Sequence, residues 1–236
     1  MTPTDTLVNR LSSVRKRLQE ACKQYQRNPD DVTLLAVSKK RPAKDVATCL
    51  SEKQRHFGEN RWPDAADKIN AFAKQSLIWH FIGPIQSNKC QGIATAFHWI
   101  HSVDRIKIAE RLSTLRTDNQ PPLQTLIQVN IDQEAQKQGL MLNQDNELVA
   151  LAETIEQAPN LTLRGLMALP KRHQSVSQQR VGFRQVKQLM NHLNQQGFSM
   201  DTLSMGMSAD LEAAIAEGST LIRVGSDIFS PQTHNE

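Results

Sequence analysis

The sequence has few cysteines and no long apolar run. Its 3 cysteines, Cys22, Cys49 and Cys90, are widely spaced and form no CxxC pair, which argues against a disulfide framework or a zinc site and favours buried thiols. No stretch approaches the roughly 20 apolar residues that a membrane span requires, and the N-terminal segment has no apolar core typical of a signal peptide. We therefore expect a cytoplasmic protein without a membrane partner.

A strong excess of one charge is also lacking. Lys and Arg total 28 and Asp and Glu total 24, which leaves a net charge of +4 scattered along the chain. This modest excess gives no reason to expect a nucleic-acid partner. The densest basic patch, between Lys39 and Lys44, is a pattern more often found on solvated surface than at a phosphate site.

Short apolar runs rich in β-branched residues recur along the chain, with helical patterns between them. The expected strands cover 32–38, 55–59, 77–83, 98–103, 123–131, 161–169, 201–207 and 220–228. An amphipathic helix is expected over about 5–26, before the first strand. Further helices are expected over 175–196, ending at Gly197, and over 209–217, with Ser208 as its N-cap.

Strands that are apolar on both faces and joined by helices favour a closed parallel barrel. We predict a (β/α)8 TIM-type barrel over about 32–229, preceded by an extra N-terminal helix, with residues 1–236 forming a single domain. A doubly wound open sheet is the structural alternative. It is disfavoured because no GxGxxG motif follows the first strand.

The carboxyl ends of barrel strands carry the working residues in this fold. Lys39 follows the first strand, where apolar walls could desolvate its amine and favour the neutral form that attacks an aldehyde. A lysine in this position alone is more often a solvated loop charge. The case for a Schiff-base lysine therefore needs support from elsewhere in the chain.

That support comes from the last two strands. Ser204, Gly206 and Ser208 precede a helix, and Gly225 and Ser226 follow the next strand, which together predict a phosphate cup. An ordinary cap and turn is the alternative for either segment. Because the last strand pairs with the first in a closed barrel, Lys39 would face this cup. An amine beside an anion site suits pyridoxal 5′-phosphate (PLP), with Arg223 available for its pyridine nitrogen.

Several motifs resemble those of the pyridoxal phosphate homeostasis proteins, and the resemblance covers nearly the whole chain. The segments that carry it are LLAVSK at 34–39, HFGEN at 56–60, WHFIGPIQSNK at 79–89, RGLMALP at 164–170 and LSMGMSADLEAAIAEGSTLIRVGSDIF at 203–229. The resemblance implies an alanine racemase-type barrel in which Lys39 holds PLP as a Schiff base. It also implies the cofactor contacts Asn60, Ser204, Met207, Ser208, Arg223, Gly225 and Ser226.

Some residues depart from the family pattern or have no assigned role. The segment Arg61-Trp62-Pro63-Asp64, after GEN, and the basic pair Lys40 and Arg41 differ from it, as does Ser230-Pro231, but none belongs to the expected cup. His80 lies in an apolar strand, where a packed, hydrogen-bonded core residue is favoured over an acid or base. Lys137 lies in a polar loop and is expected to be a solvated charge.

The sequence favours a carrier over an enzyme. A racemase needs a second acid/base group opposite the lysine, and the single tyrosine, Tyr25, precedes the first strand. Arg223 at the pyridine nitrogen would disfavour ring protonation and weaken the electron sink. We expect a non-catalytic, monomeric PLP carrier that supplies PLP-requiring apoenzymes, and the family resemblance implies a role in vitamin B6 and amino-acid homeostasis.

Two alternatives remain open at this stage. A small PLP-dependent amino-acid racemase or lyase would use Lys39 as base, with His80 as a possible second group. A barrel that binds another phosphate ester without a covalent step is the other alternative. An assay against D- and L-amino acids tests the first, and a visible absorption spectrum tests the second.

Overall fold

Strands and helices alternate along the chain. The computed structural model describes residues 6–117, 119–131, 138–169 and 175–230. The strands are β1 Thr33–Val37, β2 His56–Glu59, β3 Ile78–Phe81, β4 Trp99–Val103, β5 Leu123–Asn130, β6 Leu140–Met141, β7 Leu161–Ala168, β8 Thr202–Ser204 and β9 Leu221–Val224. The α-helices are α1 Leu7–Gln24, α2 Ala43–Ser51, α3 Ala66–Ala71, α4 Cys90–Ala96, α5 Ile106–Leu115, α6 Asp145–Gln157, α7 Val176–Gln195, α8 Leu211–Ala216 and α9 Ser226–Phe229.

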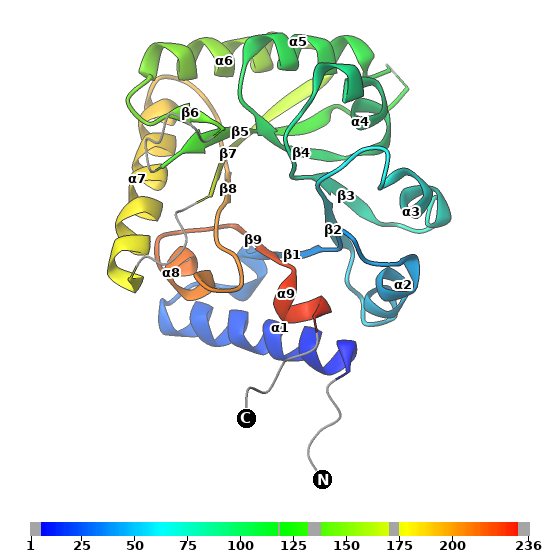
Figure 1. Ribbon diagram of the computed structural model, residues 1–236. Coiled ribbons are helices and arrows are strands. Elements are labelled where there is room, and N and C mark those ends of the chain that lie inside the picture. Colours follow the sequence, from blue (N-terminus) through cyan, green and yellow to red (C-terminus); the bar gives the residue numbers. More distant parts are fainter. Residues whose placement is uncertain (1–5, 118, 132–137, 170–174, 231–236) are drawn as a thin grey trace.

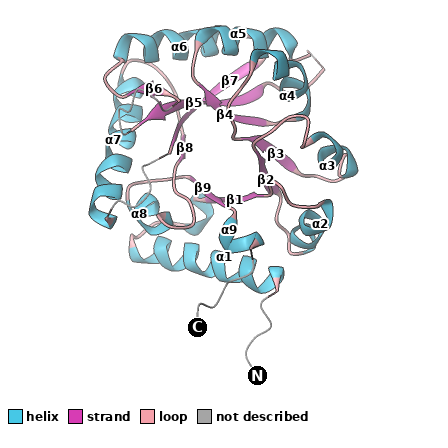
Figure 2. Cartoon of the chain, viewed as in Figure 1, coloured by secondary structure: helices cyan, strands magenta, loops and turns pink. Residues whose placement is uncertain are grey.

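All strands except β6 form a closed ring of parallel neighbours. The order runs β4-β3-β2-β1-β9-β8-β7-β5, and a β4–β5 pairing closes it. Figure 1 looks along the axis of this ring, and Figure 2 shows helices around its outside. The predicted (β/α)8 barrel with an N-terminal helix is therefore confirmed. The two-residue strand β6, which pairs with β5, was not predicted.

The outer helices bury one face each, as the apolar spacing predicts. Helix α7 buries Phe183, Val186, Leu189, Met190 and Leu193, the face expected from the sequence. The chain leaves this helix at Gly197, whose φ of 113° lies in the region that glycine reaches without strain. The helix expected over 175–196 is therefore confirmed to within one residue at each end.

Helix α1 packs across the outside of the barrel beside the last two helices. Its buried face includes Leu11, Val14, Leu18 and Cys22, as predicted. It contacts α8, α9 and α2, and Figure 1 shows it running below α8 and α9. The helix thus braces the segments that follow β8 and β9.

Three predicted boundaries near the carboxyl end are wrong. The strand expected over 201–207 ends at Ser204. The strand expected over 220–228 ends at Val224, because the N–H groups of Ile228 and Phe229 bond to the Gly225 carbonyl and begin α9. Helix α8 begins at Leu211 rather than at residue 209, and Asp210 rather than Ser208 occupies the N-cap position. Asp210 Oδ1 accepts a hydrogen bond from the Met207 N–H at 2.5 Å, which curls the chain before the helix starts.

Cys22, Cys49 and Cys90 are free and buried, as expected. Within the described ranges, no group of His, Cys, Asp and Glu side chains is arranged to hold a metal ion. None of the described helices combines the length and apolarity needed to cross a membrane.

Candidate functional site

Most of the predicted site residues follow strands at the seam where the last strand of the chain, β9, pairs with the first, β1. Strand β9 pairs with both β8 and β1, and β1 pairs with β2. The register sets Ala36 against Val224 and Val37 against Gly58. The carboxyl ends of these strands therefore bring the segments after Val37, Glu59, Ser204 and Val224 to one end of the barrel.

Lys39 lies in the turn directly after β1 and is exposed. Its amine makes no hydrogen bond or ion pair with any residue that the structure describes. The expected enclosure by apolar walls is wrong for the protein alone, because Ser38 takes the last buried position and Lys39 begins the turn. The amine is therefore accessible to a ligand that arrives at the barrel end.

A buried ion pair lies beneath this turn. Lys68 Nζ is 2.6 Å from Glu59 Oε1 and donates to the Ser38 carbonyl oxygen at 2.8 Å. The Ser38 hydroxyl also donates to Glu59 Oε1, at 2.6 Å. Sequence reasoning missed Lys68, although a glutamate at the end of a buried strand signals that a cation is close. This network fixes the backbone immediately before Lys39.

Two serines of the predicted cup face each other across the seam. Ser208 Oγ lies 3.1 Å from Ser226 Oγ, so the two hydroxyls form one polar spot. Gly206, between β8 and this spot, has a φ of 96°, and a Cβ there would lie 2.5 Å from the Cβ of Ala214. Gly225 packs against Val37, which sets the end of β9 against the end of β1. We call Ser208 and Ser226 the serine pair.

Arg17 of α1 anchors the segments that carry the serine pair. It donates to the Ser208 carbonyl at 2.7 Å, to Asp227 Oδ2 at 2.9 Å and, through two nitrogens, to the Glu212 carboxylate. The hydrogen bond from Arg17 lowers the pKa of Glu212, and the same bond raises the pKa of Arg17. Sequence reasoning read α1 only as a packing helix and missed this anchor.

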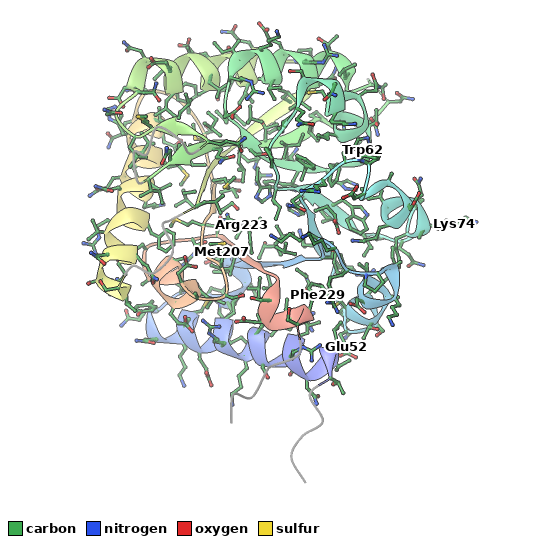
Figure 3. All side chains as sticks on the ribbon, viewed as in Figure 1. Glu52, Trp62, Lys74, Met207, Arg223 and Phe229 are labelled. Atoms are coloured by element: carbon green, nitrogen blue, oxygen red, sulfur yellow. The ribbon has the colours of Figure 1, made fainter. Side chains whose placement is uncertain are left out.

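Ser204 and Arg223 lie together inside the barrel. Arg223 Nη1 donates to the Ser204 carbonyl and hydroxyl oxygens at 2.5 and 2.6 Å, and Nη2 donates to the Ala168 carbonyl at 2.8 Å. Ser204 thus contacts Arg223 rather than the serine pair. In the sequence, Met207 lies between Ser204 and Ser208, and its N–H donates a hydrogen bond to Asp210. Figure 3 shows Arg223 and Met207 close to each other in the part of the ring formed by β9 and β8.

The Arg223 guanidinium retains hydrogen-bonding capacity. A guanidinium has five N–H donors, and the contacts above use three. Burial lowers the pKa of Arg223 to about 10, so the group remains a cation at neutral pH. A buried cation that has two N–H groups without a partner among the described residues is suited to an acceptor atom of a ligand.

Asn60 follows β2 and lines a cavity of about 450 Å³. The cavity walls include Arg61, Trp62 and Asp64 from the segment that departs from the family pattern. Trp62 packs edge-on against Phe97 and covers Gly92, where a Cβ would clash with the indole. The departure thus shapes the cavity beside Asn60 and leaves the serine pair untouched.

His80 is fully buried and hydrogen-bonded, which confirms the core role favoured by the sequence. Its ring nitrogens lie 2.9 Å from ring nitrogens of His56 and His101. Lys137, expected to be a solvated loop charge, lies outside the described residues.

Comparison with known proteins identifies first the fold of this chain and then its family. The family model described as "Alanine racemase, N-terminal domain" matches residues 10–232, so the chain is a barrel of the alanine racemase class. An alanine racemase of Clostridium difficile shares the fold alone, with 12% identity, a TM-score of 0.70 and coverage of 94% of this chain and 57% of that chain.

Full-length relatives narrow the class. The pyridoxal phosphate homeostasis protein of Pseudomonas aeruginosa is 45% identical over 229 residues, which are 97% of each chain. The chain belongs to the pyridoxal phosphate homeostasis protein family. A solved structure of PipY from Synechococcus elongatus, with PLP bound, has 32% identity and a TM-score of 0.82 over 95% of this chain and 100% of that chain.

Proposed function

We propose that this protein binds PLP at the carboxyl end of its barrel, covalently through Lys39, and acts as a non-catalytic PLP carrier in vitamin B6 and amino-acid homeostasis. The observation that supports the proposal is the pairing of β8 with β9 and of β9 with β1, which sets Lys39, the serine pair and Arg223 at the carboxyl ends of neighbouring strands. The family and the PLP-bound relative PipY support the choice of ligand.

Each group of residues has a chemical task in this proposal. Lys39 would hold the cofactor covalently, because its Nζ in the neutral form is the nucleophile that an aldehyde requires. The serine pair would hold the phosphate, beside the backbone of Met207 and Gly225. Arg223 would donate toward the pyridine nitrogen, Ser204 holds Arg223 in place, and Asn60 would face the ring from the side of β2.

The same residues favour binding over catalysis. Bound PLP supplies an electron sink for carbanion chemistry, and that sink is strongest when its ring nitrogen is protonated. Arg223 is a cation that donates to this atom, so it disfavours ring protonation. Tyr25, the single tyrosine, lies at the far end of α1, before β1 begins, with the Arg180 guanidinium over its ring.

A PLP-dependent racemase or lyase is the second candidate, because the fold is that of alanine racemase. It predicts steady turnover of amino acids by the PLP-loaded protein. The carrier predicts no turnover above that of free PLP across a panel of D- and L-amino acids. It also predicts that the loaded protein restores activity to an apoenzyme that requires PLP.

Borohydride reduction followed by peptide mapping tests the attachment. The expected result is one modified lysine, Lys39, in protein loaded with PLP. Lys39→Ala should abolish the modification, while Lys40→Ala, which changes the neighbouring exposed lysine, should retain it. A covalent, yellow Lys39→Ala protein would contradict the proposed site.

We propose a monomer as the working state. The exposed large apolar side chains among the described residues are Ile106, Leu169, Val176 and Val181, a small set for a subunit interface. Light scattering on the PLP-loaded protein measures the mass directly. A mass of twice 26.6 kDa would contradict the monomer.

A further inference from the structure

A row of hydrogen bonds crosses the barrel interior and ends at Arg223. His56 Nδ1 lies 2.9 Å from His80 Nε2, and His80 Nδ1 lies 2.9 Å from His101 Nε2. His101 Nδ1 lies 2.8 Å from Ser204 Oγ, which accepts from Arg223 at 2.6 Å. Strands β4 and β8 are not neighbours in the ring, so the contact between His101 and Ser204 spans the interior. We call His56, His80, His101 and Ser204 the histidine relay.

The two central members of the relay are isolated from water and neutral. His80 and His101 are fully buried. Burial, followed by the neighbouring histidines for His80 and by Arg223 for His101, lowers their pKa well below 6.5. A neutral imidazole has one donor nitrogen and one acceptor nitrogen. Their shared contact is therefore satisfied only when both rings carry the proton on the same kind of nitrogen.

The relay consequently has two possible orders. In the first, each Nδ1–H donates onward in the direction of Arg223, and Ser204 Oγ accepts from both His101 and Arg223. In the second, the Ser204 hydroxyl donates to His101, and each Nε2–H donates in the direction of His56. Protonating His56 puts a proton on its Nδ1, which only the first order accommodates. The protonation state of His56 thus determines whether Ser204 accepts from His101 or donates to it.

The surroundings of the relay leave His56 as the place where a proton can enter. His56 is partly exposed at the start of β2, whereas His80 stacks on Trp99 with ring centroids 5.5 Å apart. The charged and titratable groups facing the row are few. Besides burial, the charge of His98 lowers the pKa of His56 and His80, and Arg116 lowers the pKa of His98. Asp210 opposes the effect of burial on the pKa of Arg223.

We propose that the histidine relay positions Arg223 and couples protonation of His56 to the binding of PLP at the opposite end of the barrel. This inference rests on the proposed function, because it assigns Arg223 to the pyridine nitrogen. The relay residues are positioning residues, since Arg223 alone among these groups contacts the cofactor. Linked sites affect each other equally, so PLP binding must also change the acid dissociation constant of His56.

Nitrogen NMR of the imidazole rings tests the relay without any measurement of turnover. In the protein without PLP, His80 and His101 should be neutral and in the same tautomer between about pH 6 and 8. Opposite tautomers would overturn the relay, because two N–H groups or two lone pairs would then face each other. Loading with PLP should change the acid dissociation constant of His56 about tenfold.

A matched pair of variants separates the relay from a simple electrostatic field. In His101→Asn the amide replaces Nδ1, which keeps the contact with Ser204 and removes the one with His80. In His101→Gln the amide replaces Nε2, which keeps the contact with His80 and removes the one with Ser204. Each variant should bind PLP yet lose the effect of PLP on His56. If either retains the full effect, charge alone couples the two ends and the relay is wrong.

The remaining outcomes distinguish the two proposals. If the unmodified protein binds PLP through Lys39 while His56 titrates unchanged, the relay fails and the proposed function stands. If it binds no PLP, the proposed function fails and the coupling fails with it. If both His101 variants fail to fold, the tautomers and the His56 titration of the unmodified protein still test the relay.

Discussion

Lys68 Nζ contacts Glu59 at 2.6 Å and the Ser38 carbonyl at 2.8 Å, so one buried ammonium joins α3, β2 and the residue before Lys39. Both side chains of the ion pair are at least nine-tenths buried, with 9% of Lys68 and 3% of Glu59 exposed. Removing either partner would leave the other charge buried without compensation, and such a charge is far more costly than a broken surface pair.

Lys68→Met is therefore expected to lower the free energy of unfolding by about 3–5 kcal/mol. Urea unfolding followed by circular dichroism measures this loss. The control is Lys74→Met, which changes an exposed lysine that points away from the barrel (Figure 3) and should have little effect. Equal stability of the two variants would show that the buried pair contributes nothing.

Arg17→Met should loosen the serine pair more than it destabilises the fold. The ion pairs of Arg17 are roughly one-third exposed, with 35% of its own side chain accessible, so their loss should cost about 1 kcal/mol or less. The Ser208 segment loses its anchor, and PLP affinity should fall about tenfold. Lys16→Met, which breaks the exposed pair with Glu20, is the control. Fluorescence titration with PLP measures both variants, and equal affinity would contradict the anchoring role.

The barrel was predictable from the sequence because each strand is an apolar run between helical patterns. Those patterns depend on neighbours in the chain, and they located every strand of the ring. The end of β9 was misread because Ile228 and Phe229 continue the apolar run into a helix. β6 was missed because two partly buried residues form no pattern of their own.

Part of the site was also predictable, since strand ends define where Lys39, Asn60 and the cup lie. The exposure of Lys39 and the contact of Ser204 with Arg223 could not be predicted, because each depends on where side chains point in the closed barrel. The pairing of Lys68 with Glu59 and the histidine relay join residues from different elements. No spacing along the sequence reports such contacts.

Ser208→Ala and Ser226→Ala should each weaken PLP binding without affecting pyridoxal, which lacks the phosphate. A hydrogen bond to a charged group contributes about 1.5–3 kcal/mol, so each loss should be about tenfold or more. Ser199→Ala, at an exposed serine before β8, should bind both compounds normally. If the variants weakened pyridoxal as much as PLP, the serine pair would not be the phosphate site.

Acid should destabilise the fold through the buried histidines. The unfolded chain binds protons at His80 and His101 near pH 6.5, whereas in the folded protein burial holds both pKa values well below that. Their contribution is complete above pH 6.5 and decreases as the pH falls, by about 1.4 kcal/mol per pH unit for each ring. Urea midpoints at about pH 7.5 and 5.5 test this. The exposed His192 offers a control, because His192→Gln should keep the same slope and His101→Asn should reduce it.

The pairing of β9 with β1 also has a consequence for how the protein is made. During translation β1 leaves the ribosome first and β9 last, and their contacts have the largest sequence separation in the sheet. Lys39 therefore stays accessible to solvent until residues 221–226 leave the ribosome and β9 pairs with β1. A truncated product that stops before β9 would display the lysine without the guanidinium and hydroxyl of the final segment, and so would be unable to retain the cofactor.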